Sequence, residues 1–393
     1  MFMKTEREQQ RELAVDRFHK GENPEAICAS LNKSLSWLYK WVSRYDDQDT
    51  SWSGSQSRRP KTDANRTPAE IVEIVKMIRL NLYNQNLFCG AQAIHWEMED
   101  QGITPLPSFR TINRILNRHS LTHRRTGRYE AKGTVYPTLP SIRANQTHQA
   151  DLVGPCYLKG PVRFYSLNVI DTATVRCGLH STASKSSQSM IDGFWSIWRR
   201  LGIPKNIQVD NAMSFFGSPT HPRGMGPLIR LCLHQGIEPW FIPMSEPWRN
   251  GMIEKFNDRY QKMFLQKTIM NTEQELQDGA LAFEQRHNSQ YRYSKLDGKT
   301  PITALADSKV TLRFPQEPKA PEHPLKKPET GRYHIIRFIR IRSNLKLDIF
   351  GEVFPVPPEL MYEYVIATVN VKEQKLKLFL NKIQVEEIKY KLR

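Results

Sequence analysis

Asn206-Ile207-Gln208-Val209-Asp210-Asn211 opens the segment that decides the fold, and Pro247-Trp248-Arg249-Asn250-Gly251-Met252-Ile253-Glu254-Lys255-Phe256-Asn257 lies near its end at Tyr260. Apolar residues alternate with polar ones up to Asp210, which predicts a strand ending at that acid. The apolar run between Gly226 and Gly236 predicts a buried helix, and 237–243 predicts a second strand. Apolar residues at three- and four-residue steps after Pro247 then predict a long amphipathic helix. One carboxylate therefore lies at a strand end and another, Glu254, one turn into a helix. Taken alone, Glu254 is equally well explained as a solvated acid near a helix N-terminus.

The residues that precede this segment add a third acid. Gln149-Ala150-Asp151-Leu152 opens a predicted strand, Lys159-Gly160 a turn, and the apolar run 164–170 a second strand. A further strand and a helix follow before Asn206. The predicted order is strand, hairpin, strand, strand, helix and strand, with acids on the first and last strands and on a later helix.

Asp151 in HQADLVG, Asp210 in VDNAMSF and Glu254 in NGMIEKFN resemble the Asp, Asp, Glu motif of retroviral integrases and insertion-sequence transposases, the DDE superfamily. His287-Asn288 and the run 296–301 resemble the segment that closes such cores. The resemblance extends over roughly 145–305 and implies a ribonuclease-H-like α/β fold. Many relatives carry a shorter spacing before the Glu, which would select Glu246, but the Asn-Gly-x-x-Glu pattern favours Glu254. Ala212 and Ser214 stand where relatives often have Gly and Glu.

The resemblance implies that Asp151, Asp210 and Glu254 are both the catalytic residues and the metal ligands. Carboxylates gathered in a partly dry site repel each other unless a cation opposes their charge. Mg²⁺ suits such oxygen ligands, with Mn²⁺ as an alternative, and two ions per active site can promote an in-line displacement at phosphorus. The implied activity is DNA cleavage followed by strand transfer into target DNA.

The composition is consistent with a DNA-binding protein. The chain has 393 residues, with 57 Lys and Arg against 40 Asp and Glu and a formal charge of +17, which favours a polyanionic partner. A basic charge alone would also suit a ribosome-associated or membrane-surface protein. We expect no membrane span and no signal peptide, because there is no long apolar run. Five scattered cysteines favour free thiols in a reducing cytosol, and we expect a prokaryotic, nucleoid-associated protein that acts on double-stranded DNA as a homo-oligomer.

Changes in composition divide the chain into seven segments. We expect a helix-turn-helix domain at 1–46, a linker at 47–66, a second helix-turn-helix or winged-helix-like domain at 67–122, a basic linker at 123–144, the catalytic core at 145–307, a Pro-rich linker at 308–332 and an SH3-like β-barrel at 333–393.

Helix and turn signals in the first 120 residues resemble two helix-turn-helix DNA readers. Other basic residues lie in the linkers, on the helix of Glu254 and on the predicted barrel strands, where they can contact phosphates. The candidate DNA contacts are Lys33, Ser34, Ser36, Trp37, Lys40, Arg58, Arg59, Arg110, Thr111, Asn113, Arg114, Arg124, Arg125, Arg128, Lys255, Arg259, Lys262, Arg337, Arg340 and Arg342, with Ser108, Lys375 and Lys377 as further candidates.

Simpler interpretations of these segments remain open. The first unit can be a three-helix bundle with an ordinary polar face, the cations after Glu254 a solvated outer face, and the barrel a protein-contact module. His148, close to Asp151, is more simply explained as a hydrogen-bonded strand residue than as a metal ligand.

We therefore interpret the sequence as a multi-domain DNA transposase or integrase. The alternative is a catalytically inactive, transposase-derived DNA-binding protein. A ribonuclease acting on RNA·DNA hybrids would share the core, but it would not explain two DNA readers.

Overall fold

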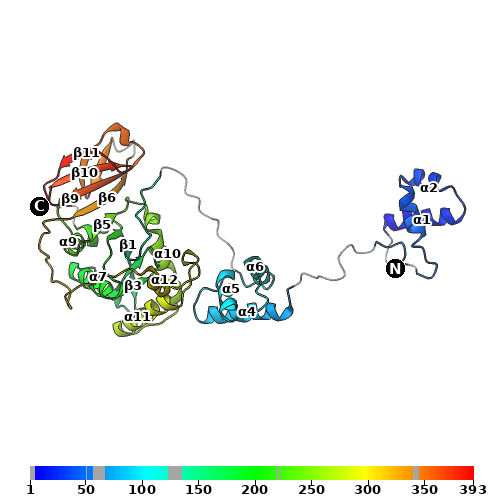
Figure 1. The fold of residues 1–393 in the computed structure, drawn as a ribbon, viewed down its shortest axis with the longest axis horizontal. Coiled ribbons are helices and arrows are strands. Elements are labelled where there is room, and N and C mark those ends of the chain that lie inside the picture. Colours follow the sequence, from blue (N-terminus) through cyan, green and yellow to red (C-terminus); the bar gives the residue numbers. More distant parts are fainter. Residues whose placement is uncertain are drawn as a thin grey trace. The chain divides into compact units, whose positions relative to one another are not determined.

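The computed structural model describes residues 5–49, 51–55, 67–122, 135–217, 220–221, 223–339 and 345–393. The chain forms two compact units, Met1–Thr67 and Pro68–Arg393 (Figure 1). None of the helices in the described parts of the chain is long and apolar enough to cross a membrane.

The first unit contains three short helices, as the sequence predicts: α1 (Glu6–His19), α2 (Pro24–Leu31) and α3 (Leu35–Val42). The Asn23 side chain caps α2, and the Ser34 side chain accepts a hydrogen bond from Trp37 N at the start of α3. Ala14, Ile27 and Leu38, one from each helix, are fully buried together. Their packing holds α3 on the other two helices and leaves its polar face exposed.

Part of the predicted linker, residues 51–55, packs on this unit. Ser53 is buried, its carbonyl oxygen accepts a hydrogen bond from Arg11 Nη1 at 2.6 Å, and its hydroxyl donates to Glu12. The Trp52 ring also packs edge-on against Tyr45. Residues 51–55 are therefore part of the packed unit, because a few aromatic and polar contacts outweigh the polar composition of this stretch.

The second unit opens with another group of three helices, α4 (Ala69–Asn84), α5 (Ala91–Asp100) and α6 (Phe109–Arg118). Val75, Ile94 and Ile112 are fully buried at its centre, and Ser108 caps α6 through its side chain. The predicted helices are thus present, while their role as a DNA reader stays a prediction.

The remainder of the second unit is organised around one mixed sheet. Its strands are β1 (Thr147–Tyr157), β2 (Arg163–Asp171), β3 (Cys177–Thr182), β4 (Asn206–Val209), β5 (Glu238–Phe241), β6 (Arg332–Phe338), β9 (Tyr364–Asn370), β10 (Lys375–Leu380) and β11 (Ile383–Lys389). Their order across the sheet is β11-β10-β9-β6-β5-β4-β1-β2-β3. β1 pairs antiparallel with β2 and parallel with β4, and β4 pairs parallel with β5. This arrangement confirms a ribonuclease-H-like core in which the first strand lies at the centre.

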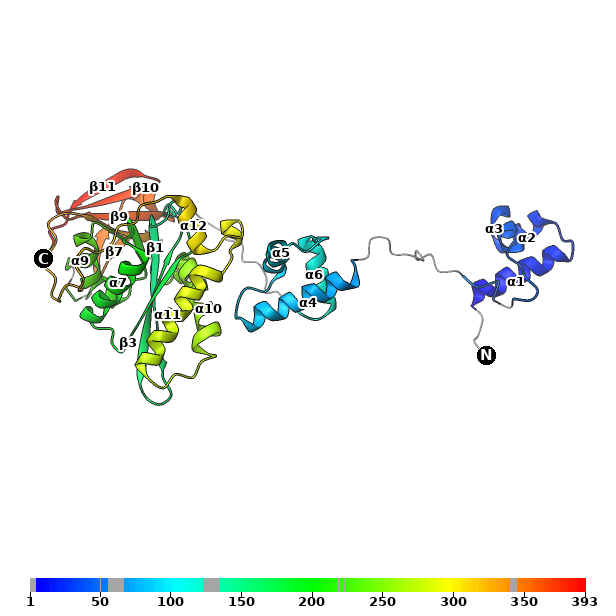
Figure 2. The same cartoon turned by 60° about the horizontal axis from the view of Figure 1, so that its bottom comes forward.

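Helices cover both faces of this sheet (Figure 2). One hydrophobic cluster contains α7 (Ser187–Leu201) and α9 (Pro227–His234), and another contains α10 (Gly251–Tyr260) and α11 (Glu273–Gln290). Shorter helices, α8 (Met213–Phe216) and α12 (Pro301–Ser308), complete the core. The helix and strand order predicted around Asp210 and Glu254 is therefore correct.

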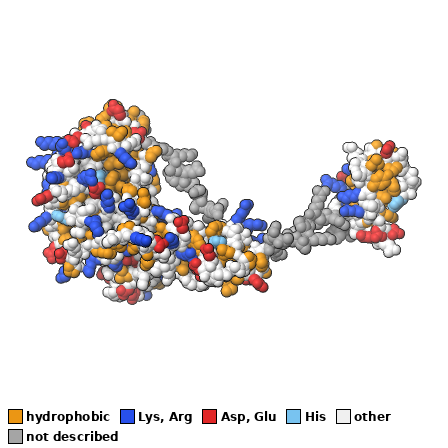
Figure 3. Space-filling model, in the orientation of Figure 1, with side chains coloured by type: hydrophobic (Ala, Val, Ile, Leu, Met, Phe, Trp, Pro, Cys, Tyr) orange, Lys and Arg blue, Asp and Glu red, His pale blue; other side chains and the backbone are white. Residues whose placement is uncertain are grey.

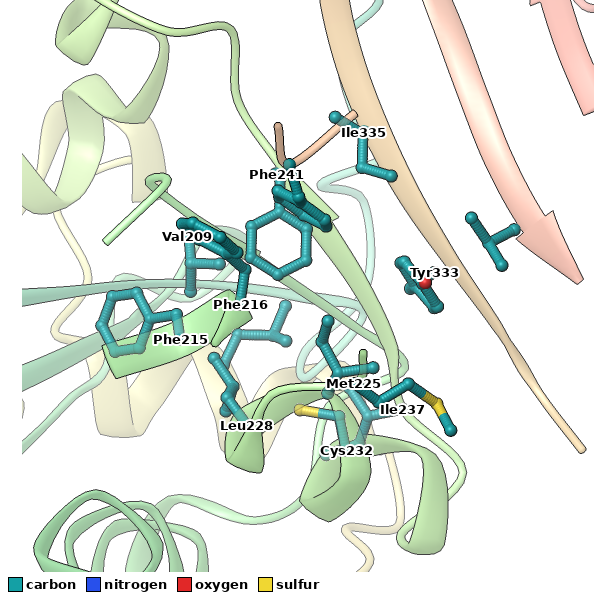
Figure 4. Close-up of a cluster of buried hydrophobic side chains, with 14 of the residues drawn as sticks. Val209, Phe215, Phe216, Met225, Leu228, Cys232, Ile237, Phe241, Tyr333 and Ile335 are labelled. Atoms are coloured by element: carbon teal, nitrogen blue, oxygen red, sulfur yellow. The ribbon is translucent and has the colours of Figure 1, made fainter. Parts of the chain in front are cut away.

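The expected C-terminal barrel is not confirmed. Strand β6 pairs with β5 through Trp240–His334 and Phe241–Ile335, so the C-terminal strands extend the core sheet. A separate hairpin is formed by β7 (Lys346–Ile349) and β8 (Glu352–Pro355). Figure 4 shows Phe241 of β5 beside Ile335 of β6, within one continuous group of buried side chains. The alternating sequence predicts these strands but does not reveal which neighbour β6 pairs with.

The Pro-rich segment 308–332, predicted to be a stiff, extended linker, packs along the core helices. Its backbone oxygens accept hydrogen bonds from Trp195 and Arg199 of α7 and from Arg230 of α9. Leu325 is buried within the main cluster. The segment therefore packs over the core helices instead of forming a free linker.

Candidate active site

Strand pairing places two of the predicted acids side by side. The parallel register between β1 and β4 pairs Gln149 with Gln208. Continuing it by two residues sets Asp151 beside Asp210, just past the end of β4, and neighbouring strands lie about 4.8 Å apart. Asp210 itself lies beyond the paired residues, and the negative charge of Asp151 raises its pKa, which agrees with a short distance between the two acids. The amide nitrogens of Leu152 and Ala212 each donate a hydrogen bond to the acid nearby, which fixes one oxygen of each carboxylate.

Three consecutive residues of β1 anchor the helix that carries Glu254. The Gln149 side-chain oxygen accepts hydrogen bonds from Met252 N and Ile253 N, both at 3.1 Å. The next residue, Ala150, accepts one from Asn250 Nδ2. Asp151 then accepts a bond from Asn257 further along α10. These contacts hold the first turns of α10 over the centre of β1 and satisfy N–H groups that a helix start leaves unpaired.

A line of buried polar side chains ends at Asp151. The Ser166 hydroxyl donates to Asn168 Oδ1 at 2.7 Å, and Asn168 Nδ2 donates to Asn257 Oδ1 at 2.8 Å. Asn257 Nδ2 in turn donates to Asp151 Oδ2 at 2.7 Å. Each donor fixes the orientation of the next side-chain amide, so the Nδ2 group of Asn257 is directed at the carboxylate of Asp151.

All three acids hold their protons more tightly than usual. Burial raises the pKa of Asp151, although the bonds from Leu152 N and Asn257 partly offset it. Burial also raises the pKa of Asp210 and Glu254, and the negative charge of Asp151 raises both further. Asp151 is therefore the electrostatic centre of the group.

The acids also lack neutralising partners. Within the described residues, no lysine or arginine nitrogen lies within ion-pair distance of any of the three carboxylates. The charge of Lys185 only lowers the pKa of Asp210 in part. In the same described ranges, no group of three or more His, Cys, Asp and Glu side chains is assembled closely enough to hold a metal ion.

Glu246, the alternative third acid, is committed elsewhere. Its carboxylate accepts hydrogen bonds from Arg249 Nε at 2.9 Å and from the Tyr364 hydroxyl at 2.8 Å, and it is only 6% exposed. Glu254 lies in the first turn of α10, and the negative charge of Asp151 raises its pKa. The position of Glu254 is the one consistent with a shared acidic site.

His148 is a strand residue whose ring is fully buried. Its Nε2 lies 3.2 Å from Asn145 Oδ1, and burial lowers its pKa to about 3. The ring is therefore neutral and structural, which agrees with the simpler of the two interpretations.

The structure contradicts the assignment of Arg337 as a DNA contact. Arg337 is 6% exposed, and its guanidinium donates to the carbonyl oxygens of Asp348 and Ile242 and to Asn211 Oδ1. Alternation along β6 suggests an outward position, but the neighbouring loop after β4 covers that face. Its N–H groups are occupied and cannot reach a phosphate.

The cations on α10 and on the turn that directly follows it differ from one another. Arg259 donates to the Tyr293 hydroxyl, and its guanidinium lies over the Phe88 ring at 4.3 Å, so packing holds it. Lys262 pairs with Asp258 at 2.6 Å on the exposed surface. Lys255 is exposed next to Glu254 and remains a candidate phosphate contact.

The predicted DNA contacts of the helical units are mostly at the surface. Those exposed or partly exposed are Lys33, Ser34, Ser36, Trp37, Lys40, Arg110, Thr111, Asn113 and Arg114. Those outside the described residues are Arg58, Arg59, Arg124, Arg125, Arg128, Arg340 and Arg342. Lys375 and Lys377 both pair with Glu387. Lysine and arginine side chains are spread over the visible face of the molecule (Figure 3).

Sequence reasoning missed several residues that support the acids. Gln149, Asn168 and Asn257 are buried or nearly so and all bond within the site. The signal available in the sequence was the spacing of Asn257 from Glu254. The two are three residues apart, and residues at that spacing share one face of a helix.

Comparison with protein families finds two matches. Residues 5–50 match the model of a homeodomain-like domain, which spans α1 to α3. Residues 235–301 match the model of an integrase core domain, a range that includes Glu254. None of the curated proteins compared with this chain matches it.

Solved structures with some similarity include the HTLV-2 integrase catalytic core domain in complex with magnesium, in its trimeric form, at 16% identity and a TM-score of 0.33, covering 42% of this chain and 99% of that one. Another is the simian T-cell lymphotropic virus intasome in complex with PP2A regulatory subunit B56 gamma, at 15% identity and a TM-score of 0.36, covering 81% of this chain and 97% of that one. The integrase core domain and the homeodomain-like domain confirm the predicted resemblance of this chain to the DDE transposase and integrase superfamily.

Proposed function

We propose that this chain is a DNA transposase or integrase in which Asp151, Asp210 and Glu254 form the site of DNA cleavage and strand transfer. The supporting observation is electrostatic. Burial raises the pKa of all three acids, and the charge of Asp151 raises that of the other two. A structural role would call for a neutralising side chain at such a site, and none of the described cations lies within ion-pair distance.

The donor set fits divalent cations. Asp151, Asp210 and Glu254 would hold Mg²⁺ or Mn²⁺, two ions in all as the resemblance implies, and carboxylate oxygen is the ligand type these ions prefer. When bound, the ions supply the positive charge that favours ionised acids beside a phosphodiester. Because no three-acid group is assembled among the described residues, the proposal includes a side-chain movement that draws Glu254 towards Asp151.

The chain's own residues then have defined tasks. Asn257 orients Asp151 through its hydrogen bond, and Gln149 fixes the start of α10, the helix that carries Glu254. Backbone N–H groups hold one oxygen of Asp151 and one of Asp210, and Asn257 holds the second oxygen of Asp151. Exposed Lys255 lies where it can bind a phosphate of the substrate strand.

DNA binding is assigned to the homeodomain-like unit. In such units the last helix enters the major groove. Here that helix is α3, and Lys33, Ser36 and Lys40 are exposed at or near it. The helices α4 to α6 are proposed as a second reader, and two readers on each of several protomers would lengthen the recognised element end.

A joining assay tests the proposal. Duplexes from the genomic sequence that flanks this reading frame would carry a 3′-hydroxyl end, and a supercoiled plasmid would be the target. We expect Mg²⁺- or Mn²⁺-dependent cleavage and joining by the wild type, and none by Asp151→Asn, Asp210→Asn or Glu254→Gln, with DNA binding retained. Retained DNA binding without any acid-dependent cleavage would instead identify an inactive DNA-binding relative.

A further inference from the structure

The C-terminal strands reach both segments that carry the later acids. Arg337 of β6 contacts the loop that follows Asp210, and Tyr364, the first residue of β9, contacts the turn that precedes α10. Both contacts are hydrogen bonds, one made by the Arg337 guanidinium and the other by the Tyr364 hydroxyl.

Arg337 joins three backbone segments. Its Nη2 donates to Asn211 Oδ1 at 3.0 Å, its Nη1 to the Ile242 carbonyl oxygen at 3.2 Å, and its Nε to that of Asp348 at 3.1 Å. Asn211 Nδ2 also donates to Ile242 O at 2.6 Å, so Asn211 is held on both sides of its amide. The residue that directly follows Asp210 is thereby fixed to β6 and to the segment after β5.

Arg337 accomplishes this as a buried cation. Burial lowers its pKa to about 10, and within the described residues no carboxylate lies within ion-pair distance of it. A buried guanidinium is retained only where its donors find oxygen partners. The planar fork of arginine can contact three separate segments at once, whereas a lysine ammonium cannot reproduce that geometry.

Tyr364 completes a second link. Its hydroxyl donates to Glu246 Oε2 at 2.8 Å and accepts from Arg249 Nη2, while Arg249 pairs with the same Glu246. The Arg249 carbonyl oxygen accepts from Gln208 Nε2 of β4 at 2.8 Å. The short helix η1 (Pro247–Asn250), which leads directly into α10 and Glu254, is therefore fixed between β4 and β9.

We infer that Arg337 and Tyr364 are positioning residues for the proposed reaction, and that the C-terminal strands form part of the catalytic fold. The inference rests on the proposed function, because it concerns the placement of Asp210 and Glu254. Arg337 sets the backbone after Asp210 through Asn211, and Tyr364 sets the turn before Glu254 through Arg249. Loss of either contact shifts one acid relative to Asp151 and leaves the DNA-reading helices of the first unit unchanged.

Four full-length variants test the inference. Tyr364→Phe removes one hydroxyl and keeps the ring, Arg337→Gln removes the fork, and Arg337→Lys keeps the charge without the fork. Leu376→Ala is the matched control. Leu376 is fully buried on β10, so its truncation should lower the stability of the C-terminal strands without removing a contact to either loop. Cleavage rate with bound flanking-sequence duplex, duplex Kd and Tm would be measured for each, with Asp151→Asn as the inactive reference.

We expect Tyr364→Phe and Arg337→Gln to cleave about tenfold to a hundredfold more slowly than the wild type, as small misplacements of catalytic groups do. Duplex Kd should change by less than about twofold, and Arg337→Lys should not restore the rate. Leu376→Ala should lower Tm and keep the wild-type rate below its own melting range. Wild-type rates in Tyr364→Phe and Arg337→Gln, or rates that follow Tm across all variants including Leu376→Ala, would overturn the inference while leaving the proposed function intact. A wild type whose cleavage does not depend on Asp151 would instead overturn the proposed function and the inference with it.

Discussion

Asn257 donates a hydrogen bond from Nδ2 to Oδ2 of Asp151 at 2.7 Å, and it lies on α10 one turn after Glu254. One helix thus supplies both an acid of the proposed site and the donor that orients another. Because Asn257 also accepts from Asn168, its amide cannot turn without leaving a buried group unpaired. This contact makes the relative placement of Asp151 and Glu254 a property of a single helix–strand interface.

Asn257→Ala should slow cleavage and shift its pH dependence. The bond from Asn257 lowers the pKa of Asp151 against the stronger effect of burial, so its loss raises that pKa further. A higher pH is then needed to ionise the acid, and the acidic limb of the pH–rate profile moves upward. We expect a loss of about tenfold at neutral pH that diminishes in alkali. The exposed Asn81→Ala serves as control, and a profile parallel to that of the wild type would contradict the assigned role.

Asp210→Asn should stabilise the protein when divalent cations are absent. Burial and then Asp151 raise the pKa of Asp210 above its unfolded value, so the folded state binds this proton more tightly. The resulting stabilisation is complete below the unfolded pKa and is lost as pH rises through the folded pKa. The Tm advantage of Asp210→Asn should therefore be small in acid and increase towards neutral pH. Added Mg²⁺ should raise the Tm of the wild type more than that of the variant. If Tm depended on pH in the same way in both proteins, Asp210 would not be an acid that lacks a neutralising partner.

The sequence was sufficient to predict the elements around the acids. Period-two and helical patterns located β4, α9, β5 and α10 to within a few residues, because each element has one clearly apolar face. The strand end at Asp210 and the first turn at Glu254 followed from the same patterns.

The contacts between distant segments were not predictable in this way. Alternation made Arg337 an outward residue of a barrel, whereas the loop after β4 covers it. Nothing local indicates that β6 adds to β5, because edge pairing depends on two strands far apart in the sequence. Ser53 was placed in a linker for a similar reason, since its partner Arg11 is distant along the chain.

Glu246→Gln should lower stability and slow cleavage through the link to Tyr364 and Arg249, whereas Glu254→Gln should abolish cleavage without a comparable loss of stability. Glu246 is buried between Arg249 and Tyr364, so its neutralisation leaves a partly buried cation unpaired and should cost about 1–3 kcal/mol of unfolding free energy. Glu254 has no such partner among the described residues, and its neutralisation should abolish cleavage with little loss of stability. Urea unfolding and the joining assay would be run on both variants. Complete inactivity of a well-folded Glu246→Gln with an active Glu254→Gln would reverse the assignment.

Lys40→Gln should weaken DNA binding uniformly across sequences. Lys40 is exposed on α3, where a phosphate contact contributes affinity without sequence information. The slope of log Kd against log salt should fall by about 1 if one phosphate contact is lost. Lys20→Gln is the control, since Lys20 is not among the candidate DNA contacts and pairs with Asp16 of α1. Equal salt slopes for Lys40→Gln and the wild type would remove α3 from the DNA interface.

Phe241→Ala should reveal whether the C-terminal strands fold together with the core. Phe241 is fully buried on β5 and lies beside Ile335 of β6, with which it pairs (Figure 4). Its ring also packs edge-on against Phe350, with 5.0 Å between the ring centroids. Its truncation leaves a cavity at the junction and should cost about 3–5 kcal/mol. If 135–393 is one cooperative unit, hydrogen exchange should accelerate together in β1, β5, β6 and β9, and denaturation should show one transition for all of them. Leu116→Ala, in the separate α4 to α6 cluster, should leave that exchange unchanged. Protection that falls only in β6 and β9, with the core unaffected, would mean that these strands form an independent domain docked on the edge of the sheet.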